Sequence, residues 1–184
     1  MNKINSLISK LLDWSNHSQK FLKIFQILNY YVPAVVAPIY GLVAIIASFQ
    51  YGASVSSVGM ILFAVLASYA CFKIYWSRAK DLLNSLENSK FFIVPAICHV
   101  IRTSGEIIFA ISMATPVLLI FVQIDVLASG YGGVLAALDL DFLAGLPILG
   151  VILVPLYGYF IMIGTKLVSE LLSAVVTIAN NTSK

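Results

Sequence analysis

The sequence has little charge, few cysteines and no recognisable catalytic motif. Only 10% of its 184 residues are charged, whereas 60% are hydrophobic. A soluble domain carries about a quarter charged residues, so this chain could not cover a water-exposed surface. The scarcity of charge argues against an ordinary soluble protein, and the length suits a single domain. We therefore expect an integral membrane protein.

Reactive groups are equally scarce. The chain contains no HExxH sequence, no serine–lysine or serine–histidine set at a plausible spacing, and no glycine-rich phosphate loop. Cys71 and Cys98 lack metal or redox spacing, and we interpret them as reduced, small apolar residues. No basic run with interleaved aromatic residues occurs, which argues against nucleic acid as a partner. We expect no enzymatic activity, no cofactor and no bound metal.

Long uncharged segments indicate four membrane-spanning helices. About 20 mostly apolar residues form a helix that crosses a bilayer. Lys23 and Lys73 enclose 49 uncharged residues, enough for two spans and a turn, and two later uncharged stretches hold 18 and 24 residues. We predict an all-α fold in which residues 30–184 form a four-helix transmembrane bundle with helical cytoplasmic extensions. The spans of the bundle are expected at about 31–49, 55–76, 107–124 and 142–165. The extension of span two is expected because Ala79, Leu82, Leu83 and Leu86 keep helical spacing.

The basic residues have a strong positional bias. All eleven Lys and Arg fall before span one, from the last turn of span two to the start of span three, or after span four. The other two loops contain none, and the second of them holds acidic residues: Asp125, Asp139 and Asp141. Because basic residues are retained on the cytoplasmic side, we expect both termini in the cytoplasm.

Residues 1–29 are expected to form amphipathic helices at the cytoplasmic surface. The apolar residues within 2–14 recur at helical spacing: Ile4, Leu7, Ile8, Leu11 and Trp14. A second short helix is predicted over 19–29. Such helices lie in the membrane interface, with the alternative that their apolar sides dock on a protein partner. Polar residues interrupt the first apolar positions, so we do not expect a cleaved signal.

Two groups of charged residues stand near the predicted cytoplasmic edge. His99, Arg102 and Glu106 share one helical face, and Lys166 and Glu170 form an i, i+4 pair on span four. One hypothesis is that the two groups form crossed ion pairs with each other, Arg102 with Glu170 and Lys166 with Glu106, within or between subunits. A second hypothesis is a proton or ion relay through the first group. We favour anchoring of the helices at the membrane interface over a relay, because a charged side chain that reaches water at the interface costs little free energy.

The acidic loop and the last span suggest further roles. Asp125, Asp139 and Asp141 could surround the outer mouth of an oligomeric pore, or form a solvated loop, which we favour. The last span is predicted to be the packing centre, because glycine allows helices to approach closely. Its prolines and glycines are Gly145, Pro147, Gly150, Pro155, Gly158 and Gly164.

The last helix carries Glu170-Leu171-Leu172, followed by Thr177-Ile178-Ala179-Asn180-Asn181-Thr182. In these residues it resembles the end of a group of small bacterial membrane proteins of unknown function. The resemblance covers the last two spans, and Thr177 stands where that group is expected to have a basic residue. It implies a location in the bacterial inner membrane and no assigned activity.

These features favour a non-enzymatic protein that acts as a scaffold or accessory subunit of a larger membrane assembly. Its expected partners are the lipid bilayer and either other membrane subunits or further copies of itself. The alternative is a small homo-oligomeric channel or transporter with the acidic loop at its mouth.

Overall fold

A computed structural model describes residues 6, 9–10, 19–50, 54–86, 93–128 and 141–182, and every one of these except Ser54 is helical. The predicted all-α class is therefore confirmed. The helices are α2 (Gln19–Gln26), the π-helical turn η1 (Ile27–Tyr31), α3 (Val32–Gln50), α4 (Val55–Leu86), α5 (Ile93–Ala128) and α7 (Asp141–Thr182). The predicted amphipathic helix over 2–14 lies almost entirely outside the described residues.

The first span begins earlier than the sequence suggested. We expected a short helix to end at Asn29 and a separate span to start near residue 31, but α2, η1 and α3 follow one another without a break. Because proline has no N–H, Pro33 cannot form the usual helical hydrogen bond to the carbonyl four residues before it. The wider π-helical turn η1 lies just before this proline. The Asn29 side chain donates to the Phe25 carbonyl at 3.0 Å, which helps to keep the chain helical.

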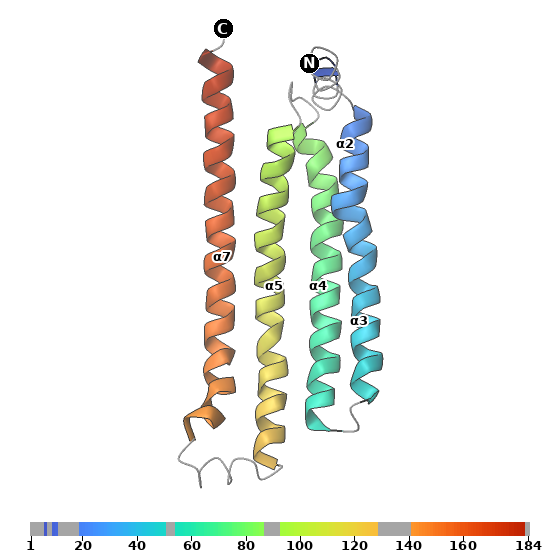
Figure 1. Cartoon of the computed structure of the whole chain (residues 1–184), viewed down its shortest axis with the longest axis vertical. Helices are drawn as coiled ribbons and strands as arrows, with labels where there is room; N and C mark the ends of the chain where they lie inside the picture. The colour runs from blue at the N-terminus through green and yellow to red at the C-terminus, as the bar shows by residue number, and fades with distance from the viewer. Residues whose placement is uncertain are drawn as a thin grey trace.

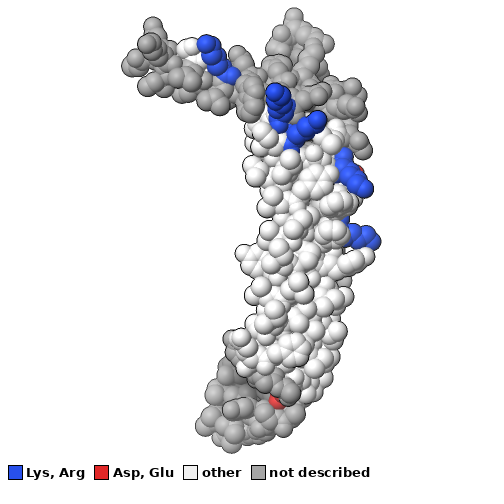
Figure 2. All heavy atoms as spheres, turned by 90° about the vertical axis from the view of Figure 1, so that its right-hand side faces the viewer, with Lys and Arg blue, Asp and Glu red and all other residues white. Residues whose placement is uncertain are grey.

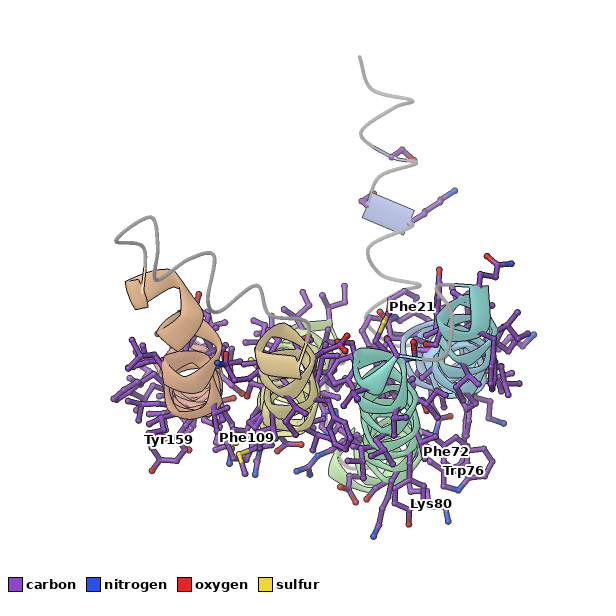
Figure 3. The ribbon with its side chains drawn as sticks, turned by 90° about the horizontal axis from the view of Figure 1, so that it is seen from below. Phe21, Phe72, Trp76, Lys80, Phe109 and Tyr159 are labelled. Atoms are coloured by element: carbon purple, nitrogen blue, oxygen red, sulfur yellow. The ribbon has the colours of Figure 1, made fainter. Side chains whose placement is uncertain are left out.

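The four long helices form a single row. Their order in space is α3, α4, α5 and α7, and the extensive contacts lie between neighbours in that order (Figures 1 and 3). The four helices of the predicted bundle are present, but they are arranged as one layer with two broad faces. The ring side chains of Phe72, Trp76, Phe109 and Tyr159 all project from the same face in Figure 3.

Four helices are long and apolar enough to cross a bilayer: Lys20–Gln50, Val55–Leu83, Ile93–Asp125 and Leu149–Val175. Many large apolar side chains on them are exposed, including Tyr40, Phe49 and Ile152. Such a surface requires a non-aqueous environment, so the fold indicates a multi-pass membrane protein. On the face shown in Figure 2, the described lysine and arginine side chains gather towards one end of the row, which we call the basic end.

The helices pack differently along their length. A hydrophobic cluster lies at the basic end, where α2 and η1 meet α4 and α5; it comprises Leu22, Tyr30, Ala79, Leu82 and Ala96. Farther from that end, small residues allow close approach. A Cβ at Gly41 on α3 would meet Ser68 on α4, and one at Gly59 on α4 would meet Phe121 on α5. Glycine thus brings neighbouring backbones together where lipid provides no hydrophobic force.

Two glycines likewise allow close approach of the backbones at the α5–α7 interface. A Cβ at Gly105 on α5 would lie 2.9 Å from Cβ of Thr165, and a Cβ at Gly158 on α7 would lie 2.6 Å from Cβ of Ser112. The hydroxyls of Ser112 and Thr165 donate to carbonyls of their own helices at 2.7 and 2.9 Å. They therefore leave no unsatisfied polar group in the contact.

The prediction that the last span is the packing centre was wrong within the chain. Helix α7 occupies one end of the row and packs on α5 alone among the long helices (Figure 1). In its most apolar 18-residue window only 6% of residues are buried, against 17–22% for the other three spans. Of its described glycines, Gly150 and Gly158 face α5, whereas Gly164 has no atom within 4 Å of its Cβ position.

Gly158→Ala is expected to weaken the α5–α7 contact, because the new methyl group overlaps Ser112. Overpacking of this kind lowers the free energy of unfolding by about 1–3 kcal/mol. Gly164→Ala is the matched control on the same helix, since its methyl group enters open space. Denaturant unfolding in micelles measures both variants, and equal losses of stability would contradict the packing described here.

Candidate functional site

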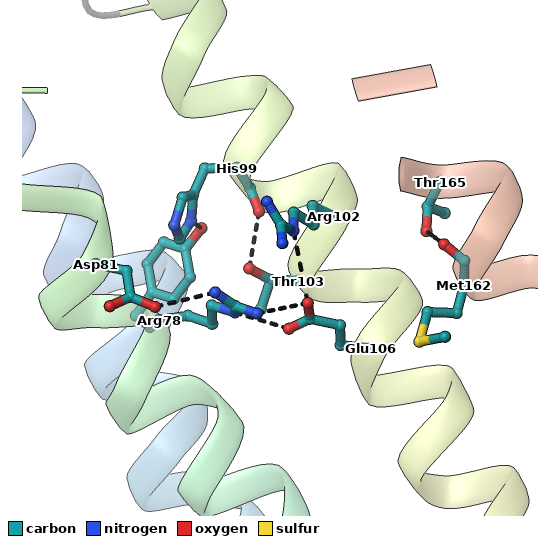
Figure 4. Close-up of polar contacts among 9 residues, drawn as sticks. Arg78, Asp81, His99, Arg102, Thr103, Glu106, Met162 and Thr165 are labelled. Atoms are coloured by element: carbon teal, nitrogen blue, oxygen red, sulfur yellow. Dashed lines mark hydrogen bonds and ion pairs between the residues drawn. The ribbon is translucent and has the colours of Figure 1, made fainter. Parts of the chain in front are cut away.

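The strongest concentration of polar contacts lies at the basic end, where η1, α4 and α5 meet (Figure 4). We call it the polar cluster; it comprises Tyr30, Arg78, Asp81, His99, Arg102, Thr103 and Glu106. Its members come from three helices that are distant in sequence, so it is formed only by the tertiary fold.

The centre of the cluster is a bidentate ion pair between α4 and α5. Arg78 donates from Nε to Glu106 Oε2 at 2.7 Å and from Nη2 to Glu106 Oε1 at 2.6 Å. The Glu106 side chain is only 14% exposed and that of Arg78 is 26% exposed. Two parallel charge-assisted hydrogen bonds fix both distance and orientation, so this pair sets the register between the two helices.

Two further charges complete the ion-pair network. Arg78 Nη1 donates to Asp81 Oδ2 at 2.9 Å, one turn along α4. Arg102 Nε lies 3.6 Å from Glu106 Oε1, one turn back along α5, and its side chain is 49% exposed. The two cations and two carboxylates neutralise one another. Because Arg102 is exposed and distant, it contributes less than Arg78.

A second connection joins the π-helical turn to α5. The Tyr30 hydroxyl lies 2.7 Å from His99 Nδ1, and the two rings meet edge to face with centroids 5.5 Å apart. Tyr30 is 1% exposed, so its hydroxyl needs this partner. Thr103 donates to the His99 carbonyl at 2.7 Å. On the other side, Gln26 donates to the Ala79 carbonyl at 2.6 Å and attaches α2 to α4.

The arrangement is suited to holding helices and less suited to moving protons. The relay hypothesis required a connected path through His99, Arg102 and Glu106. Instead, His99 is bonded to Tyr30, and the Glu106 carboxylate receives Arg78 and Arg102. A cavity of about 170 Å³ adjoins the cluster, lined by Leu28, Asn29, Tyr30, Pro33, Tyr75, Val100, Thr103 and Ser104. No ionisable group of the ion-pair network lines this cavity. The geometry therefore favours the anchoring interpretation.

The predicted crossed pairs are not formed within the chain. Glu106 binds Arg78 and not Lys166, and among the described residues no ion pair involves Lys166 or Glu170. The physical reason is the direction of neighbouring side chains on α5. Gly105 faces α7, and the next residue is rotated by about 100° around the helix axis, which directs Glu106 towards α4. Crossed pairing between subunits stays a prediction.

The predicted acidic group is only partly described. Asp125 Oδ2 accepts a hydrogen bond from Ser56 at 2.7 Å, which joins α5 to the start of α4 at the end opposite the polar cluster. Asp139 and the side chain of Asp141 lie outside the described part of the chain. One acid is thus occupied in an interhelical contact, and the proposed ring stays a prediction.

Sequence reasoning missed several residues of the network. The predicted continuation of span two is present, since α4 continues to Leu86. The sequence did not show that Arg78 and Asp81 on this continuation belong to the ion-pair network with α5. Tyr30 and Gln26 gave no local signal, because their partners are 69 and 53 residues away.

Gln123 on α5 is another polar residue that the sequence did not single out. Within the described residues it supplies the sole buried side-chain oxygen or nitrogen without a hydrogen-bond partner, Oε1. An unsatisfied buried acceptor costs about 1–3 kcal/mol. The cysteines behave as expected, since Cys71 and Cys98 are free and buried. The searched part of the chain holds no group of three or more potential metal ligands.

Comparison with protein-family models, with curated proteins and with solved structures found no match. The role of the polar cluster is therefore argued from its geometry alone.

Glu106→Gln is expected to lower the free energy of unfolding by about 1.5–3 kcal/mol, because it leaves the Arg78 guanidinium with only the more exposed Asp81 as its counter-charge. Arg102→Gln, the matched control one turn away, is expected to cost at most about 0.5 kcal/mol, since that side chain is solvated. Denaturant unfolding in micelles compares the two. If Arg102→Gln were as destabilising as Glu106→Gln, Arg78 would not be the dominant partner.

Proposed function

We propose that this protein is a non-enzymatic scaffold or accessory subunit of a larger membrane assembly in a bacterial inner membrane. The observation that carries the proposal is the open row of helices. A single layer buries little of each span, and α7 at the end of the row packs on α5 alone among the long helices, which leaves the side turned away from α5 available for contact. A protein that works alone gains nothing from such an exposed helix, whereas a subunit needs an accessible surface.

The end of α7 is the favoured contact region. Leu171 and Val175 lie at the basic end of the bilayer-crossing stretch Leu149–Val175 and are 67% and 63% exposed, and Figure 1 shows α7 continuing from there past the ends of α4 and α5. At this edge of the bilayer core water begins to reach the helix, and exposed apolar side chains are driven out of water. Contact with another subunit would bury them, and the polar cluster would hold the rest of the row in a fixed shape beside that partner.

We further propose that the basic end of the row lies in the cytoplasm. Lysine and arginine side chains gather there, as the retention of basic residues on the cytoplasmic side requires (Figure 2). The channel alternative receives no comparable support. Each long helix packs chiefly on its neighbours in the row, so a lumen would have to form between copies.

The orientation is tested by thiol labelling of intact bacterial cells expressing single-cysteine variants in a Cys71→Ala, Cys98→Ala background. Gln50→Cys at the end of α3 is expected to react with a membrane-impermeant reagent. Lys80→Cys is expected to react only after permeabilisation. Reaction of both residues from the same side would contradict a four-span protein with a cytoplasmic basic end.

The assembly role is tested by extracting the tagged protein in native nanodiscs and determining the composition by native mass spectrometry. We expect complexes that contain further membrane subunits or copies of the chain. Leu171→Ser combined with Val175→Ser is expected to lower their yield at least about tenfold, equivalent to about 1.4 kcal/mol of association energy. Ile46→Ser on α3 is the lipid-facing control. A lone monomer from wild-type extracts would refute the proposal.

A further inference from the structure

The cavity of about 170 Å³ beside the polar cluster has a wall that is polar but uncharged. Polar atoms make up about half of this wall, and none of the described side chains that line it carries a charge. The lining residues come from η1 and the first residues of α3, from α4 and from α5. Leu28 and Ser104 are exposed, so the cavity opens to the surface of the row. A small polar group can therefore enter it from outside the protein.

Pro33 leaves backbone oxygens of η1 without their helical donors. The N–H of Val32 donates to the Ile27 carbonyl, and Pro33, the next residue, has no N–H. The Leu28 carbonyl therefore has neither an α-helical nor a π-helical donor, and the Asn29 carbonyl lacks its α-helical donor. A helical carbonyl points along the axis towards the residue four positions on. Both oxygens thus lie beside Pro33, which lines the cavity together with Leu28 and Asn29.

Two hydroxyl groups of the wall are also placed to accept. The Ser104 hydroxyl donates to the Val100 carbonyl at 2.9 Å, and the Thr103 hydroxyl donates to the His99 carbonyl at 2.7 Å. Each hydroxyl hydrogen is engaged in this way, while the oxygen keeps a lone pair for a further donor. The wall therefore offers more acceptors than donors.

The cavity lies at the depth of lipid headgroups. Gln50 at the far end of α3 is twenty residues from Tyr30, and Val55 at the far end of α4 is twenty residues from Tyr75. Each interval spans about 30 Å of helix, which is the thickness of the hydrocarbon core of a bilayer. With the far ends of α3 and α4 at one surface of the core, the cavity lies at the other surface, where phospholipid headgroups begin.

We propose that this cavity binds the ammonium group of an ethanolamine phospholipid. A primary ammonium has three N–H donors and no acceptor, which complements a wall rich in carbonyl and hydroxyl oxygens. Hydrogen bonds from such a charged donor are stronger than those between neutral groups. The adjoining ion-pair network does not oppose the cation, because its two arginines and two carboxylates neutralise one another. The proposal needs only membrane insertion, so it can hold or fail independently of the assembly role.

Other occupants match the wall less well. An anionic headgroup would face carbonyl oxygens without a cation among the described lining residues. Choline carries the same positive charge but has no N–H, so it can be attracted only by the rings of Tyr30 and Tyr75, which lie edge to face with centroids 6.5 Å apart. Water can occupy a polar cavity of this size. A cavity that holds only water would show no preference among headgroups.

The test uses purified full-length protein in micelles and a mixture of dioleoyl lipids. The probe is dioleoylphosphatidylethanolamine, and its N-methyl, N,N-dimethyl and choline counterparts have the same chains and charge but progressively fewer N–H donors. We expect native mass spectrometry to show retention that falls along this series, by at least about tenfold from ethanolamine to choline. Equal retention across the series would overturn the proposal. Stronger retention of dioleoylphosphatidylglycerol than of the ethanolamine lipid would overturn it as well.

Variants then locate the site. Pro33→Ala supplies an N–H to the η1 carbonyls and Ser104→Ala removes a hydroxyl oxygen, so each is expected to lower the preference for ethanolamine over choline about fivefold. Pro38→Ala is the control for the first, because Pro38 lies within α3 away from the cavity. Thr115→Ala is the control for the second, because Thr115 donates to a carbonyl of the same helix at 2.9 Å, as Ser104 does. An undiminished preference in both cavity variants would place the headgroup elsewhere and overturn the proposal.

A stability measurement provides a second readout that does not depend on mass spectrometry. Alanine is favoured over proline within a helix, so Pro33→Ala is expected to fold without added lipid. The ethanolamine lipid should raise the denaturation midpoint of the wild type and of Pro38→Ala more than that of Pro33→Ala. Equal stabilisation of all three would exclude the η1 carbonyls as ligands. Stabilisation by free ethanolamine without retention of the ethanolamine lipid would show a soluble-amine site and refute the lipid assignment.

Discussion

Inside a bilayer, apolar side chains gain nothing by leaving lipid for one another, and this constraint governs how the chain is held together. Helix pairs must instead rely on close van der Waals contact or on polar bonds. The protein uses glycine where the helices cross the apolar region, as at Gly105 and Gly158, and uses the Arg78–Glu106 pair at the basic end. A conventional hydrophobic cluster appears beside that ion pair, around Leu22 and Leu82, where α2 and η1 meet α4 and α5.

The fold class was predictable because it depends on quantities that a sequence displays directly. The length of each uncharged stretch gave four helices, and the structure has four of sufficient length and hydropathy. Helix ends were less predictable. The continuation of α4 past its span was predicted, because apolar residues keep helical spacing there, and α4 extends to Leu86. The π-helical turn that lets the chain pass Pro33 without a break is not encoded by hydropathy.

For the polar cluster, the local sequence pattern could identify residues that share a helical face but not their partners on other helices. His99, Arg102 and Glu106 were found because their spacing places them together on one helix. The partners that determine what they do, Arg78 and Tyr30, come from other helices. Choosing Arg78 over Lys166 as the partner of Glu106 required knowing which side of α5 faces α4, and that depends on where Gly105 meets α7. The position of a helix in the row is a tertiary property, so the prediction of a central last span failed for the same reason.

The order of the helices in space equals their order in the chain. Each long helix therefore packs mainly on the one synthesised immediately before it, and no span has to wait for a distant partner or insert between two that are already paired. Contacts between consecutive elements keep loop-closure costs low and favour rapid folding. Such a chain can complete its tertiary contacts stepwise as it leaves the ribosome. Its last helix then still has one side open to whatever arrives next.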